Sequence, residues 1–116
     1  MEKPNYQTSI RRWKDGWHGE TWAQLAAPLD NKVMSFATRK SSDGSLTTTI
    51  ACLEHTGIEG MLRIPLYGGF VKHIVTHPKR VTEKLVREQH ERALSMLDAI
   101  TQEAVEFFLV PKAKAA

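Results

Sequence analysis

The chain has 116 residues, of which 41% are hydrophobic and 25% are charged, and its formal net charge is +3. This length suits one domain with one core, and the composition excludes a disordered, collagen-like or disulfide-rich chain. The single cysteine, Cys52, excludes an intrachain disulfide and a zinc site built from several cysteines. We therefore expect one soluble domain that spans residues 1–116.

Neither terminus nor any apolar run indicates a membrane. The N-terminal residues lack the apolar stretch of a secretory signal, and the apolar runs, such as residues 107–110, reach only four residues. A lone free cysteine fits a reducing compartment. The sequence thus predicts a cytoplasmic protein with no membrane partner.

Residues 1–32 form an N-terminal arm whose pattern is the least readable. Tyr6 to Trp13 alternates as a short strand does, and then Gly16 and Gly19 interrupt the pattern. Residues 22–29 suit either a short helix or another strand, and Pro28 would end any helix there.

Residues 33–77 are predicted to form antiparallel strands. Residues 33–40 and 46–54 are rich in strand-forming residues, and Asp43-Gly44 between them is a strong turn signal, so we expect a hairpin. Residues 61–67 contain Pro65, which favours an edge strand or a bulge, and residues 70–76 suit a fourth strand. We expect Met34 and Phe36 to share one face of the first strand. Leu46, Ile50 and Cys52 should share one face of the second strand.

Residues 78–110 are predicted to form one long amphipathic helix, followed by a basic tail at 111–116. The apolar positions fall in one arc of about 140° at 100° per residue. A helix from residue 79 to residue 109 would measure about 45 Å, longer than the strands of a small sheet at about 17–20 Å. A kink, packing by the N-terminal segment or a partner helix would resolve the mismatch.

The spacing in the second half of this helix favours the partner helix. Apolar residues alternate by four and three positions, as in a coiled-coil seam. They are Ala93, Leu97, Ile100, Ala104 and Phe107. We therefore predict an α+β fold, with an antiparallel sheet of about four strands and one long C-terminal helix, that dimerises through these residues. The alternative is that the same stripe covers the chain's own sheet.

Motifs for catalysis and metal binding are weak. His73 and His77 have a metal-like spacing, but Pro78 biases His77 toward extended backbone, which would separate the two by about 13 Å. Cys52 and His55 are three residues apart and would point to opposite faces of a strand. Phosphate-loop, dinucleotide and nucleophile-elbow motifs are absent from the sequence. We expect no catalytic residue, metal or cofactor, and an enzyme using His55, His73 or His77 is the least favoured class.

The N-terminal arm carries the strongest functional signal. Trp13, Trp17 and Trp22 lie within ten residues of one another, beside the cationic Arg11, Arg12 and Lys14. Aromatic rings among cations suit stacking of unpaired bases, at about 1–3 kcal/mol per base, with phosphates held by the cations. The alternative for each tryptophan is packing against the sheet with its N–H bonded.

Charge is also uneven along the chain. Residues 1–80 carry 11 basic and 7 acidic side chains, whereas residues 81–116 carry 5 and 6. If the helix covers one sheet face, the other face would be basic and rich in threonine, with Arg39, Arg63, Thr47 and Thr49. An ordinary solvated sheet face is the competing interpretation.

These patterns predict a small non-enzymatic protein that binds nucleic acid, single-stranded or without sequence readout. The expected contacts are Arg11, Arg12, Trp13, Lys14, Trp17, Arg39, Lys40 and Arg63. The alternative is a protein-interaction or assembly module that docks a protein partner through the long helix or an exposed sheet edge. The order of sheet and helix is similar to that of dimers that bind single strands, a likeness of architecture alone. Exposure of the tryptophans decides between these functions, because a buried Trp13 cannot stack on a base.

Overall fold

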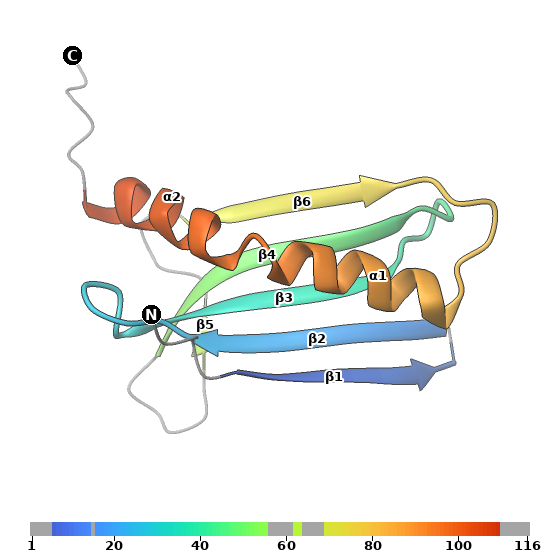
Figure 1. Ribbon diagram of the computed structural model, residues 1–116, viewed down its shortest axis with the longest axis horizontal. Helices are drawn as coiled ribbons and strands as arrows, with labels where there is room; N and C mark the ends of the chain where they lie inside the picture. The colour runs from blue at the N-terminus through green and yellow to red at the C-terminus, as the bar shows by residue number, and fades with distance from the viewer. Residues whose placement is uncertain (1–5, 15, 56–61, 64–68, 110–116) are drawn as a thin grey trace, which may run out of the picture.

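Two consecutive helices lie across one face of an antiparallel sheet in the computed structural model of the chain (Figure 1). The structure describes residues 6–14, 16–55, 62–63 and 69–109. The sheet order is β1-β2-β3-β4, with β6 and the short β5 both paired to β4. This confirms the predicted α+β class. The strands are β1 (Tyr6–Trp13), β2 (Gly16–Gln24), β3 (Lys32–Lys40), β4 (Leu46–His55), β5 (Leu62–Arg63) and β6 (Val71–Thr76), and the helices are α1 (Glu83–Leu94) and α2 (Leu97–Leu109).

The N-terminal arm is a hairpin of two long strands, so the prediction of about four strands was too low. β1 and β2 pair antiparallel from Tyr6 opposite Ala23 to Trp13 opposite Gly16. Gly16 has a φ of +124°, which only glycine adopts readily, at the start of β2. The inward positions of β2 include Gly19, Thr21 and Ala23, which give almost no hydrophobic alternation. That weak pattern explains why β2 could not be assigned from the sequence.

The hairpin predicted around Asp43-Gly44 is confirmed. The Ser41 N–H donates to the Ser45 carbonyl at 2.8 Å, and Gly44 adopts a φ of +90°. The Asp43 carboxylate accepts hydrogen bonds from the Ser45 hydroxyl at 2.6 Å and the Ser45 N–H at 2.9 Å. These bonds, that of the hydroxyl first, lower the pKa of Asp43. The turn sets the register in which Lys40 lies opposite Leu46.

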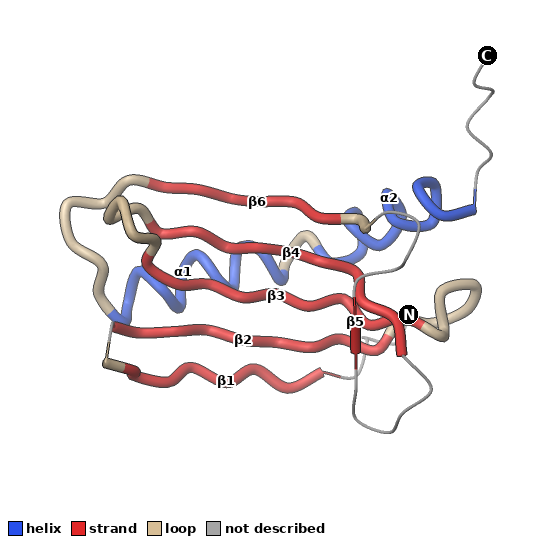
Figure 2. Tube along the Cα trace, turned by 180° about the vertical axis from the view of Figure 1, so that it is seen from behind, coloured by secondary structure: helices blue, strands red, loops and turns tan. Residues whose placement is uncertain are grey.

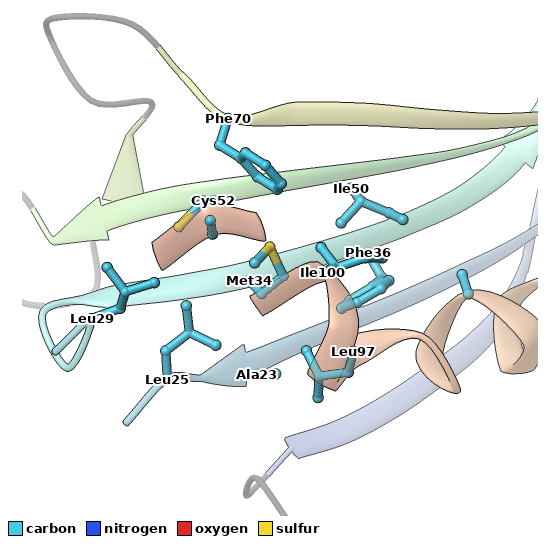
Figure 3. Close-up of a cluster of buried hydrophobic side chains, with 12 residues drawn as sticks. Ala23, Leu25, Leu29, Met34, Phe36, Ile50, Cys52, Phe70, Leu97 and Ile100 are labelled. Carbon is cyan, nitrogen blue, oxygen red and sulfur yellow. The ribbon is translucent and has the colours of Figure 1, made fainter. Parts of the chain in front are cut away.

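The core lies between the sheet and the helices (Figure 3). Met34 pairs with Cys52 and Phe36 pairs with Ile50, and all four side chains are buried on the face that α1 and α2 cover. The predicted shared faces of the two central strands are therefore confirmed. Burying a large apolar side chain contributes about 1.5–3 kcal/mol, so this cluster supplies a main part of the stabilisation.

The prediction of one continuous C-terminal helix is corrected, because the chain breaks at Ser95 and Met96 into α1 and α2. The Ser95 hydroxyl donates to the Arg92 carbonyl at 2.6 Å, and the Met96 N–H donates to the Ala93 carbonyl at 3.0 Å, three residues back. Serine competing for a helix carbonyl and a tightened last turn are both known causes of such breaks. Of the three resolutions of the length mismatch, the fold combines a break in the helix with packing by the N-terminal segment, whose Ala23, Leu25 and Leu29 join the core beneath the helices.

The predicted dimer seam is also corrected in its placement. Ala93, Leu97, Ile100 and Ala104 are at most 4% exposed within one chain, where they pack on the chain's own sheet. Phe107, at 36% exposed, is the one seam residue at the surface. The stripe therefore covers the chain's own sheet, which was the alternative interpretation. The homodimer stays a prediction, and it would have to form through another surface.

A polar layer joins α1 to the sheet beside this apolar core. His90 is fully buried, with its Nε2 2.7 Å from the Thr21 hydroxyl and its Nδ1 2.8 Å from the Thr38 hydroxyl. The Thr21 hydroxyl lies 2.8 Å from that of Thr8, and the Thr38 hydroxyl 2.7 Å from that of Thr48. One imidazole thus links hydroxyls from strands β1 to β4.

The neighbouring Gln89 extends this layer to β6. Its amide nitrogen donates to the carbonyls of Leu46 and Ile74, at 3.1 and 3.2 Å, and lies 3.0 Å from the Thr48 hydroxyl. Its carbonyl oxygen accepts from the Thr76 hydroxyl at 2.5 Å. In the part of the chain that the structure describes, every buried side-chain nitrogen and oxygen has a hydrogen-bond partner. Such a fully satisfied network fixes the position of α1 on the sheet.

The Gln89 amide nitrogen can only donate, so the Thr48 oxygen accepts from it. Threonine hydroxyls can donate or accept, so each ring nitrogen of His90 has a hydrogen-bond partner in either tautomer. Because burial lowers the pKa of His90 to about 4, the imidazole is neutral near pH 7, with one nitrogen donating and the other accepting.

Replacing Gly19 should test how tightly this layer is packed. A Cβ at Gly19 would lie 3.0 Å from His90 Nδ1 and 3.0 Å from the Ile10 Cδ1 atom. We expect Gly19→Ala to lower the free energy of unfolding by about 1–3 kcal/mol, measured by urea denaturation. Glu20→Ala, one residue along on the other face, should change it by no more than about 0.5 kcal/mol. An unchanged urea midpoint for Gly19→Ala would show that α1 sits more loosely on β2.

Candidate functional site

The sheet face that points away from the helices (Figure 2), here called the outer face, carries two exposed tryptophans, one on β1 and one on β2. Strand register places alternate residues of each strand on it, and the helices lie behind the sheet in this view. Its members are Ser9, Arg11 and Trp13 of β1, His18, Glu20 and Trp22 of β2, Ser35, Ala37 and Arg39 of β3, Thr47, Thr49 and Ala51 of β4, and Val71, His73 and Val75 of β6.

Two tryptophans stand on this face with most of their surface in solvent. Trp13 is 56% exposed and Trp22 is 51% exposed. The Trp13 ring lies 5.8 Å from the His18 ring, centroid to centroid, at an interplanar angle of 44°. Large exposed apolar rings on one face are typical of a binding surface. The exposure of Trp13 removes the objection that its ring is buried in the core.

The centre of the outer face carries small side chains. Ser35, Ala37, Thr47, Thr49 and Ala51 occupy the two middle strands, between the tryptophans of β1 and β2 and the valines of β6. All five are half-buried, although no helix covers them. A partner lying across the sheet would therefore contact small side chains in the middle and larger side chains, tryptophan on one side and valine on the other, at the two sides.

Cationic side chains collect at one end of the sheet, here called the basic end. The β1–β2 turn, the β3–β4 turn and the connection from β6 to α1 all lie there (Figure 1). Within the described ranges none of these cations forms an ion pair, all are exposed, and Asp43 is the carboxylate in the β3–β4 turn. The residues are Arg11, Arg12, Lys14, Arg39, Lys40, Lys79 and Arg80.

The structure brings part of the predicted contact set together. Arg11, Trp13 and Arg39 lie on the outer face, and Lys14 is exposed in the β1–β2 turn beside them. This arrangement joins two strands that are separated by β2 in the sheet. The predicted threonines Thr47 and Thr49 lie on the same face.

The remaining predicted contacts lie elsewhere. Arg12, Trp17 and Lys40 alternate to the side that the helices cover, where Trp17 is half-buried. Arg63 lies in β5 with its backbone opposite Glu54, and its side chain falls outside the described part of the structure. Trp17 therefore belongs with the packing interpretation, whereas Arg12 and Lys40 remain at the basic end without sharing the outer face.

Sequence reasoning left Trp22 out of the expected contacts, together with His18 and Glu20. All three follow from strict alternation along β2, since His18, Glu20 and Trp22 are two residues apart. The signal was present, but it needed the assignment of residues 16–24 as a strand, which the glycines obscured.

The buried titratable groups are not poised for chemistry. Burial raises the pKa of the Cys52 thiol to about 11, so the thiol stays protonated and unreactive near neutral pH. Burial lowers the pKa of His90 to about 4. Among the described residues, no three histidine, cysteine, aspartate or glutamate side chains are grouped so as to hold a metal ion. None of the described helices is both long and apolar enough to cross a bilayer.

A shallow groove of about 300 Å³ lies between α1 and the strands β4 and β6 at the basic end. We call it the α1 groove. Its lining mixes apolar and charged side chains from α1 with residues at the end of β6. They are Leu46, Thr76, His77, Pro78, Leu85, Glu88, Gln89 and Arg92.

Comparisons of the chain with protein-family models, with curated proteins and with solved structures gave no significant match. The outer face, the basic end and the α1 groove are therefore the features from which a function can be inferred.

The buried His90 predicts a specific pH dependence of stability. Its pKa is about 4 in the folded chain, against about 6.5 in an unfolded one, so the unfolded state binds the proton more tightly. The free energy of unfolding should fall as the pH drops from about 6.5 to about 4, by about 3 kcal/mol from this group alone. Urea denaturation across this range measures the effect. His90→Gln should be less stable at neutral pH and show a shallower pH slope, and an equal slope would mean that His90 is not buried as described.

Proposed function

We propose that the outer face binds single-stranded nucleic acid without reading its sequence. The observation that carries the proposal is the exposure of Trp13 and Trp22 on the same sheet face as Arg11 and Arg39. Aromatic platforms beside a cationic track are the arrangement that sequence-tolerant single-strand binders use.

The tryptophans supply the stacking surfaces. Trp13 pairs with Gly16 at one end of the β1–β2 hairpin, and Trp22 lies six residues farther along β2, about 20 Å away at 3.3 Å per residue. Two rings at this separation would stack on two different bases of one strand rather than on neighbours. Duplex bases are already stacked and present only their edges, so this surface favours unpaired strands.

The basic end supplies the phosphate contacts. Arg11 and Arg39 reach the outer face from β1 and β3, and Lys14 extends the cationic surface into the turn. Because no carboxylate of the described residues pairs with them, their charge is available to phosphates. Glu20 lies on β2 between the two tryptophans and repels phosphate. The phosphate path should therefore follow the basic end rather than the middle of β2.

Tryptophan emission provides the test, because the three rings differ in position. A short single-stranded oligonucleotide should quench emission at low salt, and the quenching should largely disappear at high salt, as counterion release requires. A variant that keeps only Trp17, with Trp13→Phe and Trp22→Phe, should lose most of the quenching. Quenching of equal size in that variant, or quenching that salt does not weaken, would contradict the proposal.

Single substitutions then assign the contacts. Trp13→Ala should weaken binding by roughly 5- to 150-fold, which corresponds to about 1–3 kcal/mol for one stacked base. Arg39→Ala should weaken binding and also reduce the salt dependence by about one phosphate contact. Lys84→Ala, an exposed cation on α1 behind the sheet, is the matched control and should leave affinity nearly unchanged. Fluorescence anisotropy of a labelled oligonucleotide measures all three, and equal losses for Arg39→Ala and Lys84→Ala would indicate non-specific charge attraction alone.

A further inference from the structure

The edge strand β6 carries one residue of the kind that discourages strand pairing, Lys72, and an ion pair compensates its charge. Among the described residues β6 pairs with β4 alone, so its other edge presents free backbone groups. Val71 and Val75 on this strand are 42% and 48% exposed. Its one charged side chain of fixed sign, Lys72, is bound to Glu103 at 2.6 Å. Long, uncharged edges with exposed apolar residues readily add another strand.

The opposite edge of the sheet is protected. β1 carries Arg11 and Arg12, both exposed, and like charges on an edge strand discourage pairing with a second copy of the same strand. The two edges therefore differ, and β6 is the one suited to pairing.

The sequence of β6 is complementary to itself in one antiparallel register. With His73 opposite His73 of a second copy, Val71 lies opposite Val75 and Val75 lies opposite Val71. Both exposed valines would then face apolar partners on the outer face, and Lys72, held by Glu103, would lie opposite Ile74 on the other face. A surface that pairs with itself in this way is what a two-fold dimer requires.

Charges elsewhere on the chain support the same arrangement. The acidic helix α2, whose charged residues are Asp98, Glu103 and Glu106, lies beside the Val71 end of β6. The α1 groove lies beside the Thr76 end of β6 and includes His77 and Arg92, with Glu88 also in its lining. Lys79 and Arg80 follow directly in the chain.

A two-fold axis through the middle of β6 exchanges its two ends. It would bring the acidic α2 of each copy toward the α1 groove and the basic end of the other copy. The same charge contact would therefore form twice in the dimer. This complementarity between two parts of one chain points to a second copy as the occupant of the edge, rather than to an unrelated protein.

We propose that the protein forms a symmetric dimer through antiparallel pairing of β6 with β6 of a second copy, with Val71 opposite Val75. The axis is perpendicular to the sheet, so the two outer faces continue one another on the same side and the helices of both copies lie on the other side. This dimer does not use the buried stripe at Ala93, Leu97, Ile100 and Ala104, and it does not depend on nucleic-acid binding.

A charge-exchange experiment tests the pairing and its register. Sedimentation of the full chain without nucleic acid, over a concentration series, should show a monomer–dimer equilibrium. Val75→Lys should raise the dissociation constant of the dimer at least about tenfold, because two lysines replace two apolar cross-strand contacts. Adding Val71→Glu in the same chain should restore the dimer, since each new carboxylate faces a new ammonium only across the interface.

The controls separate pairing from folding and from general charge effects. Ser9→Lys places the same charge on the outer face of the other edge strand and should leave the dissociation constant unchanged. Urea denaturation should show that all variants fold. A native chain that stays monomeric, a dimer that Val75→Lys does not weaken, or a double variant that remains dissociated would each overturn the proposal. Because no oligonucleotide is present, these results stand apart from those on the outer face.

Discussion

The rest of the structure depends on the buried hydrogen bonds between His90 and two threonines of the sheet. Apolar packing alone would let α1 slide or rotate by a small amount, because hydrophobic attraction has no direction. A neutral imidazole instead needs a donor for one nitrogen and an acceptor for the other, and the observed placement of α1 gives each nitrogen a threonine hydroxyl. Gly19 makes this placement sterically feasible, since a larger residue would contact the ring. The helix is thereby fixed to one face of the sheet, and the opposite face is defined.

Strand alternation then determines which side chains form the outer face. Thr21 faces His90 because it occupies an inward position of β2, and the same alternation turns Trp22 outward. A shift of one residue in β2 would exchange the two, burying a tryptophan where a threonine hydroxyl is needed. The polar layer and the exposed tryptophans are thus two consequences of one register. The inward residues that hold the helix are threonines and small residues, which leaves the large aromatic rings for the outer face.

The sequence predicted those parts of the fold that depend on strong local signals. Asp43-Gly44 specified a hairpin, and the apolar alternation around Phe36 and Ile50 assigned the buried face of its two strands. β2 escaped assignment because its inward positions hold Gly19, the small Ala23 and Thr21, and Thr21 bonds to His90 instead of packing as an apolar side chain, so the periodic signal is weak. The stripe from Ala93 to Ala104 has a period that suits a partner helix and a sheet equally well. The burial of these residues in the chain's own core decides for the sheet, and the break at Ser95, where the hydroxyl bonds to the Arg92 carbonyl, is not a feature that periodicity registers.

The two edges of the sheet show how one set of charges can serve two purposes. Arg11 discourages pairing at the β1 edge and also lies on the outer face near Trp13, where under the proposed function it would contact phosphate. On β6 the lysine Lys72 is paired with Glu103, and the exposed valines suit another copy of the same strand. If both proposals hold, the two-fold axis at His73 places the two basic ends at opposite extremes of one continuous outer face. A nucleic-acid strand that contacts both basic ends must then cross the small side chains of the central β-strands, and Glu20 of each copy lies to one side of that path. The length of oligonucleotide that binds best would follow from this span, and it would be longer for the dimer than for a single chain.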